Sequence, residues 1–230
     1  MTKSNDKKNQ RRGGFYWLDN KPYASVTTIL RVIDKPQLRY WFGKQVYLAM
    51  VANPSLSEKE AMAAPYAVSD KARSRGTTVH SIVEAYKHSK KHIDEQVAEE
   101  WKGYAKSYYK AMEELHINVL EHERTVVSEK HRYAGTLDVL AKVGDSELPN
   151  VIDIKTGKDI YSDYALQVSA YKYALEESGI HIKEASVLLL REDGTYKYEV
   201  MPDKIDAFLA AKTLWEGINS EDLLKIGYLK

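Results

Sequence analysis

The sequence predicts an α/β protein with a mixed central β-sheet flanked by helices. Helical periodicity dominates the first half of the 230 residues, after an aromatic N-terminal hairpin. From about residue 117 three β-like segments follow one another, and then come a helix, a second hairpin and a last helix. This order of elements is typical of one α/β domain in which helices cover a mixed sheet.

Composition narrows the classes of protein that fit. The 34 lysines and arginines nearly cancel the 33 acidic residues, so the net charge of +1 argues neither for nor against nucleic acid. The sequence has no cysteine, which excludes disulfides, thiolate zinc sites and iron–sulfur clusters and suits a reducing compartment. No apolar run approaches the roughly 20 residues that span a bilayer, and the polar N-terminus is no secretory signal. We therefore expect a soluble, cytoplasmic protein without a membrane partner.

The chain divides into a tail and one domain. Residues 1–14 are polar, basic and end in two glycines, and they are expected to form a disordered basic tail. Residues 15–230 are expected to form a single domain with three parts. The first part, 15–116, is mostly helical and opens with the hairpin, the sheet core covers 117–200, and a C-terminal helix lies in 201–230.

Local signals place the elements within these parts. Ser25 caps a short helix, and Pro36 begins a second one. Ser57 and Glu60 form a capping box before a further short helix. The remaining elements are helices at about 66–89, 94–116, 163–178 and 203–218, strands in NVLEHERTVVSEK, YAGTLDVLAKV and NVIDIKTG, and a hairpin turning at Asp193-Gly194.

The strand NVIDIKTG, which begins at Asn150, places charges where apolar residues suggest burial. Side chains alternate faces along a strand, so Asp153 and Lys155 share one face while Ile152 and Ile154 take the other. A buried charge is costly unless it is paired, hydrogen-bonded or bound to a metal. We therefore expect the apolar face to pack under a helix and the charged face to line a site.

A second acid is expected opposite the first. A turn centred on Asp145-Ser146 pairs the strand with YAGTLDVLAKV and puts Asp138 opposite Asp153. Two facing carboxylates repel, and Mg²⁺ between them would turn the repulsion into chelation. Lys155 could orient or deprotonate an attacking water and stabilise charge on a phosphate. The alternative is a plain salt bridge between Lys155 and one of the acids.

Several short motifs occur in a definite order along the sequence. GTLD at 135–138 precedes DIK at 153–155 and QVSAY at 167–171; upstream lie GTTVH at 76–80, Glu123, and SVTTIL from Ser25. Together they resemble the PD-(D/E)XK nuclease superfamily, and within it the RecB-like exonuclease branch, which includes phage exonucleases and the mitochondrial genome maintenance exonuclease. The resemblance covers about residues 23–175. The acid before the lysine motif is Asp153, the less frequent choice in that superfamily.

The resemblance implies a restriction-endonuclease-like core and a deoxyribonuclease that depends on Mg²⁺ or Mn²⁺. The implied metal ligands are His80, Asp138, Asp153 and the main-chain carbonyl of Ile154. The implied catalytic residues are Glu123, Asp138, Asp153, the lysine Lys155, and the pair Gln167 and Tyr171, which would position the site or the DNA strand. Imidazole is a better ligand for Mn²⁺ than for Mg²⁺, so His80 bears on metal preference.

DNA is the expected partner. Arg73 and Arg75 lie just before His80 in the sequence, and Lys158 follows the DIKTG segment. Lys87, Lys90 and Lys91 lie at the end of the predicted helix and just beyond it. Such cations could contact phosphates, although each alone is ordinarily solvated surface. No base-reading module is visible, so sequence-specific recognition is not expected.

These observations favour a DNA exonuclease that acts on single-stranded ends. Three alternatives stay open at the level of sequence. The first is a structure-specific or restriction-type endonuclease of the same fold, because the core chemistry does not encode end-dependence. The second is a non-catalytic DNA-binding subunit that retains the nuclease fold. The third is an unrelated hydrolase with paired carboxylates, such as a glycosidase, in which Lys155 and a metal would have no role.

Overall fold

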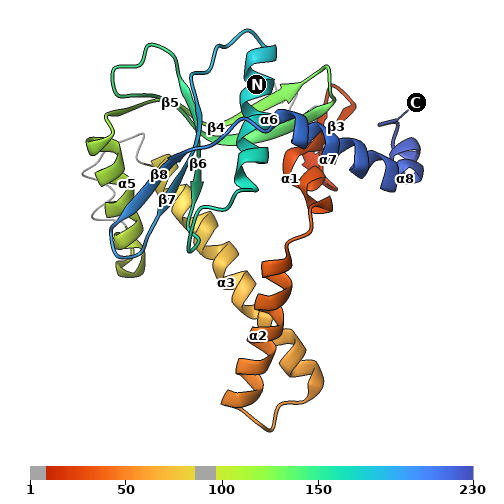
Figure 1. Cartoon of the computed structure of the whole chain (residues 1–230), viewed down its shortest axis with the longest axis vertical. Coiled ribbons are helices and arrows are strands. Elements are labelled where there is room, and N and C mark those ends of the chain that lie inside the picture. The colour runs from red at the N-terminus through yellow and green to blue at the C-terminus, as the bar shows by residue number, and fades with distance from the viewer. Residues whose placement is uncertain (1–8, 86–96, 230) are drawn as a thin grey trace, which may run out of the picture.

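A mixed β-sheet of eight strands with helices on both faces forms the body of the computed structural model, which describes residues 9–85 and 97–229 (Figure 1). Seven strands run in the order β1-β2-β3-β5-β6-β7-β8, and β4 pairs with β5 outside this path. The strands are β1 (Asn9–Arg12), β2 (Phe15–Leu18), β3 (Lys21–Ser25), β4 (Ile117–Ser128), β5 (Tyr133–Val143), β6 (Asn150–Lys155), β7 (Ala185–Leu190) and β8 (Tyr196–Val200). The predicted fold class, a mixed sheet flanked by helices after an N-terminal hairpin, is confirmed.

Helices connect the strands and cover the sheet. They are α1 (Val26–Ile29), α2 (Pro36–Ala52), α3 (Glu58–Ala85), α5 (Lys102–Glu114), α6 (Tyr164–Glu177), α7 (Ile205–Ile218) and α8 (Ser220–Lys225), with short 3₁₀ helices η1 (Leu30–Val32) and η2 (Glu99–Trp101). None of the helices in the described ranges is long and apolar enough to cross a membrane.

Two apolar cores lie on the two faces of the sheet. One joins α6 and α7 to side chains such as Leu137, Val151 and Val187. The other joins α5 and the end of α3 to side chains such as Ile152 and Ile154. The prediction that only one face of β6 is buried in apolar packing is therefore wrong. Val151, on the face of Asp153, is fully buried, because α6 covers the start of the strand, and the charged groups lie toward its end.

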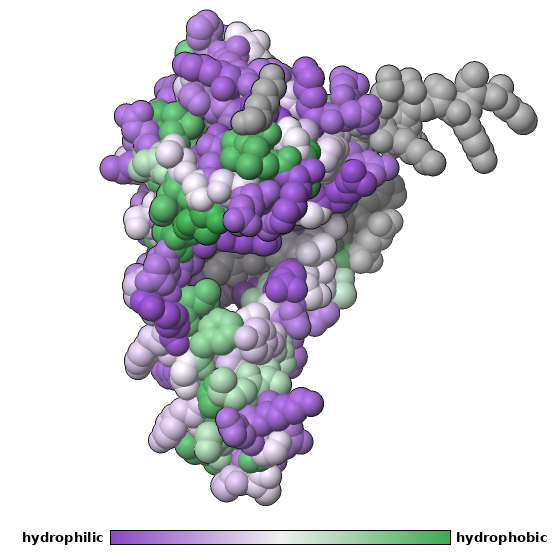
Figure 2. Space-filling view, turned by 90° about the vertical axis from the view of Figure 1, so that its right-hand side faces the viewer, coloured by the Kyte–Doolittle hydropathy of each residue, from purple (hydrophilic) through white to green (hydrophobic). Residues whose placement is uncertain are grey.

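Helices α2 and α3 form a hairpin that projects from the body as an arm (Figure 1). Helix α2 contains no buried residue, and α3 carries the arm back into the body, where Val79, Ile82 and Val83 are buried. Large apolar side chains are exposed on the arm, as the green patches of Figure 2 show. They are Leu38, Tyr40, Tyr47, Leu48, Met50, Val51, Met62, Tyr66 and Val68.

Several predicted boundaries need correction. Residues 9–12, predicted to lie in a disordered tail, form β1, because Gly13 and Gly14 adopt positive φ and turn the chain back along β2. The short helix after Ser57 and the helix predicted from residue 66 are one helix, α3, which continues through Pro65. The C-terminal part holds two helices, α7 and α8, instead of one. Residues 1–8, Lys87, Lys90 and Lys91 lie outside the described residues.

Candidate active site

One edge of β5 is divided between two partner strands. β4 pairs with β5 over its whole length, so β3 and β6 must share the opposite edge. β3 pairs with Tyr133 and Ala134, and β6 pairs with residues 139–141. β3 runs parallel to β5 and β6 runs antiparallel to it, so their carboxyl ends approach each other. The segment 135–138, the predicted GTLD motif, lies in the gap between these two ends.

The predicted register of the β5–β6 hairpin is confirmed. Val139 faces Ile152, Leu140 faces Val151 and Ala141 faces Asn150, which continues to Asp138 opposite Asp153. At that position the backbone ladder stops, and the Asp138 side chain replaces it. Its Oδ2 accepts a hydrogen bond of 2.6 Å from the Ile154 backbone N–H. The two backbone groups of a strand residue point to the same neighbour, so the Ile154 carbonyl also faces the gap.

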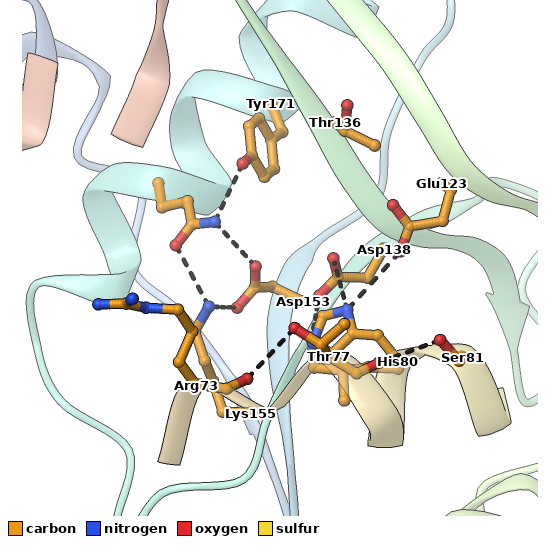
Figure 3. A network of polar contacts seen from close by, with 12 residues as sticks. Arg73, Thr77, His80, Ser81, Glu123, Thr136, Asp138, Asp153, Lys155 and Tyr171 are labelled. Atoms are coloured by element: carbon orange, nitrogen blue, oxygen red, sulfur yellow. Dashed lines mark hydrogen bonds and ion pairs between the residues drawn. The ribbon is translucent and has the colours of Figure 1, made fainter. Parts of the chain in front are cut away.

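Asp153 is the centre of a polar network with Lys155, Gln167 and Tyr171 (Figure 3). Asp153 is 1% exposed, and its Oδ2 lies 2.6 Å from the Lys155 Nζ. The Gln167 Nε2 donates to Asp153 Oδ1 at 3.0 Å and contacts the Tyr171 hydroxyl at 3.0 Å. The Gln167 Oε1 accepts from Lys155 at 3.4 Å. Gln167 and Tyr171, one turn apart on α6, are thus placed beside the acid.

A second cluster joins His80 to the acids from the other direction. The His80 Nδ1 lies 3.5 Å from Asp138 Oδ1 and 3.6 Å from Glu123 Oε1 (Figure 3). One ligand atom from each of His80, Glu123 and Asp138 lies within 4.8 Å of the others. Glu123 faces Asp138 from β4 and has a positive φ of 48°, which is unusual for a residue other than glycine. Strain of this kind concentrates at functional sites.

The electrostatics of the cluster favour a bound cation. Burial, followed by the charge of Asp153, raises the pKa of Asp138 to about 7. Burial alone would lower the pKa of Lys155, but the charges of Asp153 and Asp138 outweigh burial and raise it. Carboxylate and carbonyl oxygens with one imidazole nitrogen form a donor set that fits Mg²⁺ or Mn²⁺. The residues present therefore fit a divalent cation, and the group within 4.8 Å contains Glu123 in addition to the predicted ligands His80 and Asp138.

The three predicted DNA-contacting cations lie in different surroundings. Arg73 is exposed, forms an ion pair of 3.1 Å with Asp70, and stands two helical turns before His80 on the same face of α3. Arg75 is half-buried and lies on another face of the helix. Burial raises the pKa of Tyr104, and the positive charge of Arg75 partly opposes that rise. Lys158 is exposed in the loop after β6. Only Arg73 shares the face that His80 presents.

Sequence reasoning missed two aromatic residues of the site. The Lys155 Nζ lies 5.0 Å from the centre of the Tyr164 ring, a cation–π contact. Tyr16 from the N-terminal hairpin shares a hydrogen bond of 3.0 Å with Thr136, inside the gap. A signal for Tyr164 existed, since it precedes Gln167 by three residues on one helix face. No sequence signal connects Tyr16 to a strand that begins more than a hundred residues later.

The fold and site together define a mixed α/β protein with a carboxylate–lysine site at a divided sheet edge. No family model matches the sequence, and no curated protein matches it. Solved structures do resemble the fold. An alkaline exonuclease from Laribacter hongkongensis is 11% identical, with 90% of each chain covered and a TM-score of 0.46.

Two further solved structures are similar at the same level. A putative exonuclease from Eubacterium rectale is 11% identical over 90% of this chain and 83% of its own, with a TM-score of 0.44. A protein described as SSO0001 is 13% identical over 85% of this chain and 76% of its own, with a TM-score of 0.40. All three TM-scores are below 0.5, and the likeness concerns the fold alone.

Proposed function

We propose that this protein is a metal-dependent nuclease that hydrolyses phosphodiester bonds in DNA, and that it acts as an exonuclease on single-stranded ends. The observation that carries the proposal is the meeting of two acids and a lysine at the gap in the sheet. Asp138 reaches across to the Ile154 N–H, and Asp153 contacts Lys155. A salt bridge alone would need one acid, and a second buried acid beside it is unfavourable without a cation.

In this proposal His80, Asp138, Asp153 and the carbonyl of Ile154 hold the metal, and Glu123 is a further acid within reach of it. When bound, Mg²⁺ or Mn²⁺ would act as a Lewis acid on the phosphate and make a water molecule more acidic. The DNA preference and the choice of metal are part of the proposal. They are supported by the motif resemblance and the oxygen-rich donor set.

Lys155 is proposed to stabilise the phosphate. Its raised pKa keeps the ammonium group charged at neutral pH, which suits a group that offsets negative charge and orients water. Gln167 is proposed to fix the side chains of Asp153 and Lys155 relative to each other, because it donates a hydrogen bond to the acid and accepts one from the lysine. Tyr171 would in turn fix Gln167. In the proposed hydrolysis, water attacks phosphorus and loses a proton, and the ester bond to the leaving oxygen breaks as that oxygen takes up a proton from solvent.

The test is digestion of end-labelled single strands in Mg²⁺ or Mn²⁺. Asp153→Ala and Lys155→Ala should each lower the rate at least about a hundredfold, since each removes charge that acts on the reacting phosphate. The matched control is the exposed pair Asp222 and Lys225 on α8, which lie 2.8 Å apart and should tolerate the same substitutions. Equal activity of wild type, Asp153→Ala and Lys155→Ala would refute the proposal.

The same assay separates the exonuclease from the endonuclease. Degradation of a linear strand with survival of a circular one supports action at ends. Cutting of the circle would assign an endonuclease with the same site chemistry. EDTA should abolish either activity, and cleavage that persists in EDTA would contradict the metal assignment.

A further inference from the structure

A groove of about 880 Å³ lies beside the candidate active site, between η1, the start of α2 and the start of α6. Such a volume falls within the range of about 300–1,000 Å³ that is usual for small-molecule sites. Apolar side chains provide much of the lining. They are Leu30, Val32, Ile33, Leu38, Phe42 and Leu166.

The groove is continuous with the site. Tyr164 and Gln167 line the groove and also contact the catalytic lysine proposed above. Gln167 extends the connection to Asp153 through its 3.0 Å hydrogen bond. If the scissile phosphate of a DNA strand lies at Lys155, the adjoining nucleotides of that strand can therefore enter the groove.

The charged residues of the groove leave one cation without a partner. The Lys35 Nζ lies 2.6 Å from the Asp163 Oδ2, and the Arg39 Nη2 lies 2.6 Å from the Asp34 Oδ2. These four charges are therefore paired. Arg31 also lines the groove, is exposed, and makes no ion pair or hydrogen bond within the described part of the chain. The lining thus carries a net positive charge located at Arg31, which suits one phosphate group.

We propose that the groove binds unpaired nucleotides next to the scissile phosphate, with bases against Phe42 and the leucines and a backbone phosphate at Arg31. Aromatic and apolar walls accept the faces of bases that are not stacked in a duplex. This inference rests on the proposed nuclease function and deepens it. On this proposal, the groove is the part of the protein that gives the preference for single-stranded DNA.

The test is binding of a short labelled single strand to the full-length protein in EDTA, followed by fluorescence anisotropy. Leu38→Glu places a negative charge in the groove and should raise the Kd about tenfold. Leu48→Glu is the matched control, because Leu48 lies on the same helix, outside the groove, with 45% exposure against 47% for Leu38. Its Kd should stay within about twofold of wild type.

Arg31→Gln provides a second readout that a structural defect would not mimic. Removal of one phosphate contact to a single strand should reduce the slope of log Kd against log salt by about 0.7. Thermal melts of each variant, run in parallel, establish that the fold is retained.

The outcomes separate this inference from the proposed function. If Leu38→Glu binds as tightly as Leu48→Glu while the wild type cleaves DNA, the groove assignment is wrong and the nuclease stands. If the groove variants bind weakly and the wild type cleaves no DNA in Mg²⁺ or Mn²⁺, the groove assignment stands and the nuclease proposal fails. An unchanged salt slope for Arg31→Gln overturns the phosphate contact.

Discussion

Tyr171 packs its ring against the backbone of Gly135, and the site depends on this contact. A Cβ at Gly135 would lie 2.3 Å from the Tyr171 Cε1, closer than real side chains approach. Tyr171 is 2% exposed and packs in the core beneath α6 and α7, so its ring cannot move aside without disturbing that packing. At the scale of single residues, the absence of a side chain at 135 therefore sets where the Tyr171 hydroxyl meets Gln167.

Gly135→Ala should consequently impair both stability and catalysis. Overpacking against the ring should cost about 1–3 kcal/mol in the free energy of unfolding. The displaced ring should also release Gln167, so the rate of DNA cleavage should fall. Urea unfolding and the digestion assay measure the two effects.

Gly217→Ala is the control for this substitution. Gly217 lies in α7, where a Cβ would meet nothing within 4 Å, so alanine should stabilise the helix by up to about 1 kcal/mol. If both glycine variants change stability with the same sign, the contact with Tyr171 does not explain the glycine at 135.

At the scale of elements, the arm and the body differ in how their helices are held. Helix α6 buries seven residues between the sheet and α7, whereas α2 buries none and packs mainly on α3. Helical stability in proteins comes mostly from packing of an apolar face. The arm should therefore open locally at a lower free energy than the body.

Amide hydrogen exchange tests this difference. Peptides from 36–52 should exchange well before peptides from 164–177, because local opening of α2 exposes no core. A dilution series distinguishes intrinsic protection from association through the exposed apolar side chains of the arm. Equal, concentration-independent protection of α2 and α6 would contradict the interpretation.

Sequence patterns were sufficient for the elements whose partners are close in the chain. β5 spans 133–143 as predicted, and the short loop of residues 144–149 after it sets the register that brings Asp138 to Asp153. Pairings with distant segments were not accessible, since β3 reaches β5 from more than a hundred residues away. The contact of Tyr171 with Gly135, the strained backbone of Glu123 and the course of α3 through Pro65 depend on tertiary packing, which local periodicity does not encode.

At the scale of the whole molecule, the site places like charges where the fold is otherwise well packed. Asp138 and Asp153 come from neighbouring strands, and Glu123 adds a third acid from β4. Only Lys155 and His80 offset them directly within the described residues. A divalent cation at this point should therefore stabilise the whole folded state, because it binds the native arrangement and not the unfolded chain.

Thermal melts with and without metal measure this coupling. At a hundredfold excess of Mn²⁺ over its Kd, the wild-type Tm should rise by about 5–10 °C. Asp138→Asn keeps an oxygen that can accept from Ile154 and removes one negative charge. Its Tm in EDTA should match or exceed that of the wild type, and Mn²⁺ should not raise it. A metal-induced rise of equal size in the variant would exclude Asp138 as a ligand.

The division of the β5 edge between two strands also affects the order in which the nascent chain can fold. β5 and β6 are neighbours in the sequence and can pair as soon as both are synthesised. β3 cannot pair with β5 until the ribosome has added Tyr133, the partner of Ala24. At about 5–20 residues per second, the ribosome takes roughly 5–20 seconds to supply that partner. Until then Tyr16 and Tyr23, buried in the finished protein, have no sheet to cover them. Among the described strands, those of the N-terminal hairpin therefore wait longest for the strand that joins them to the rest of the sheet.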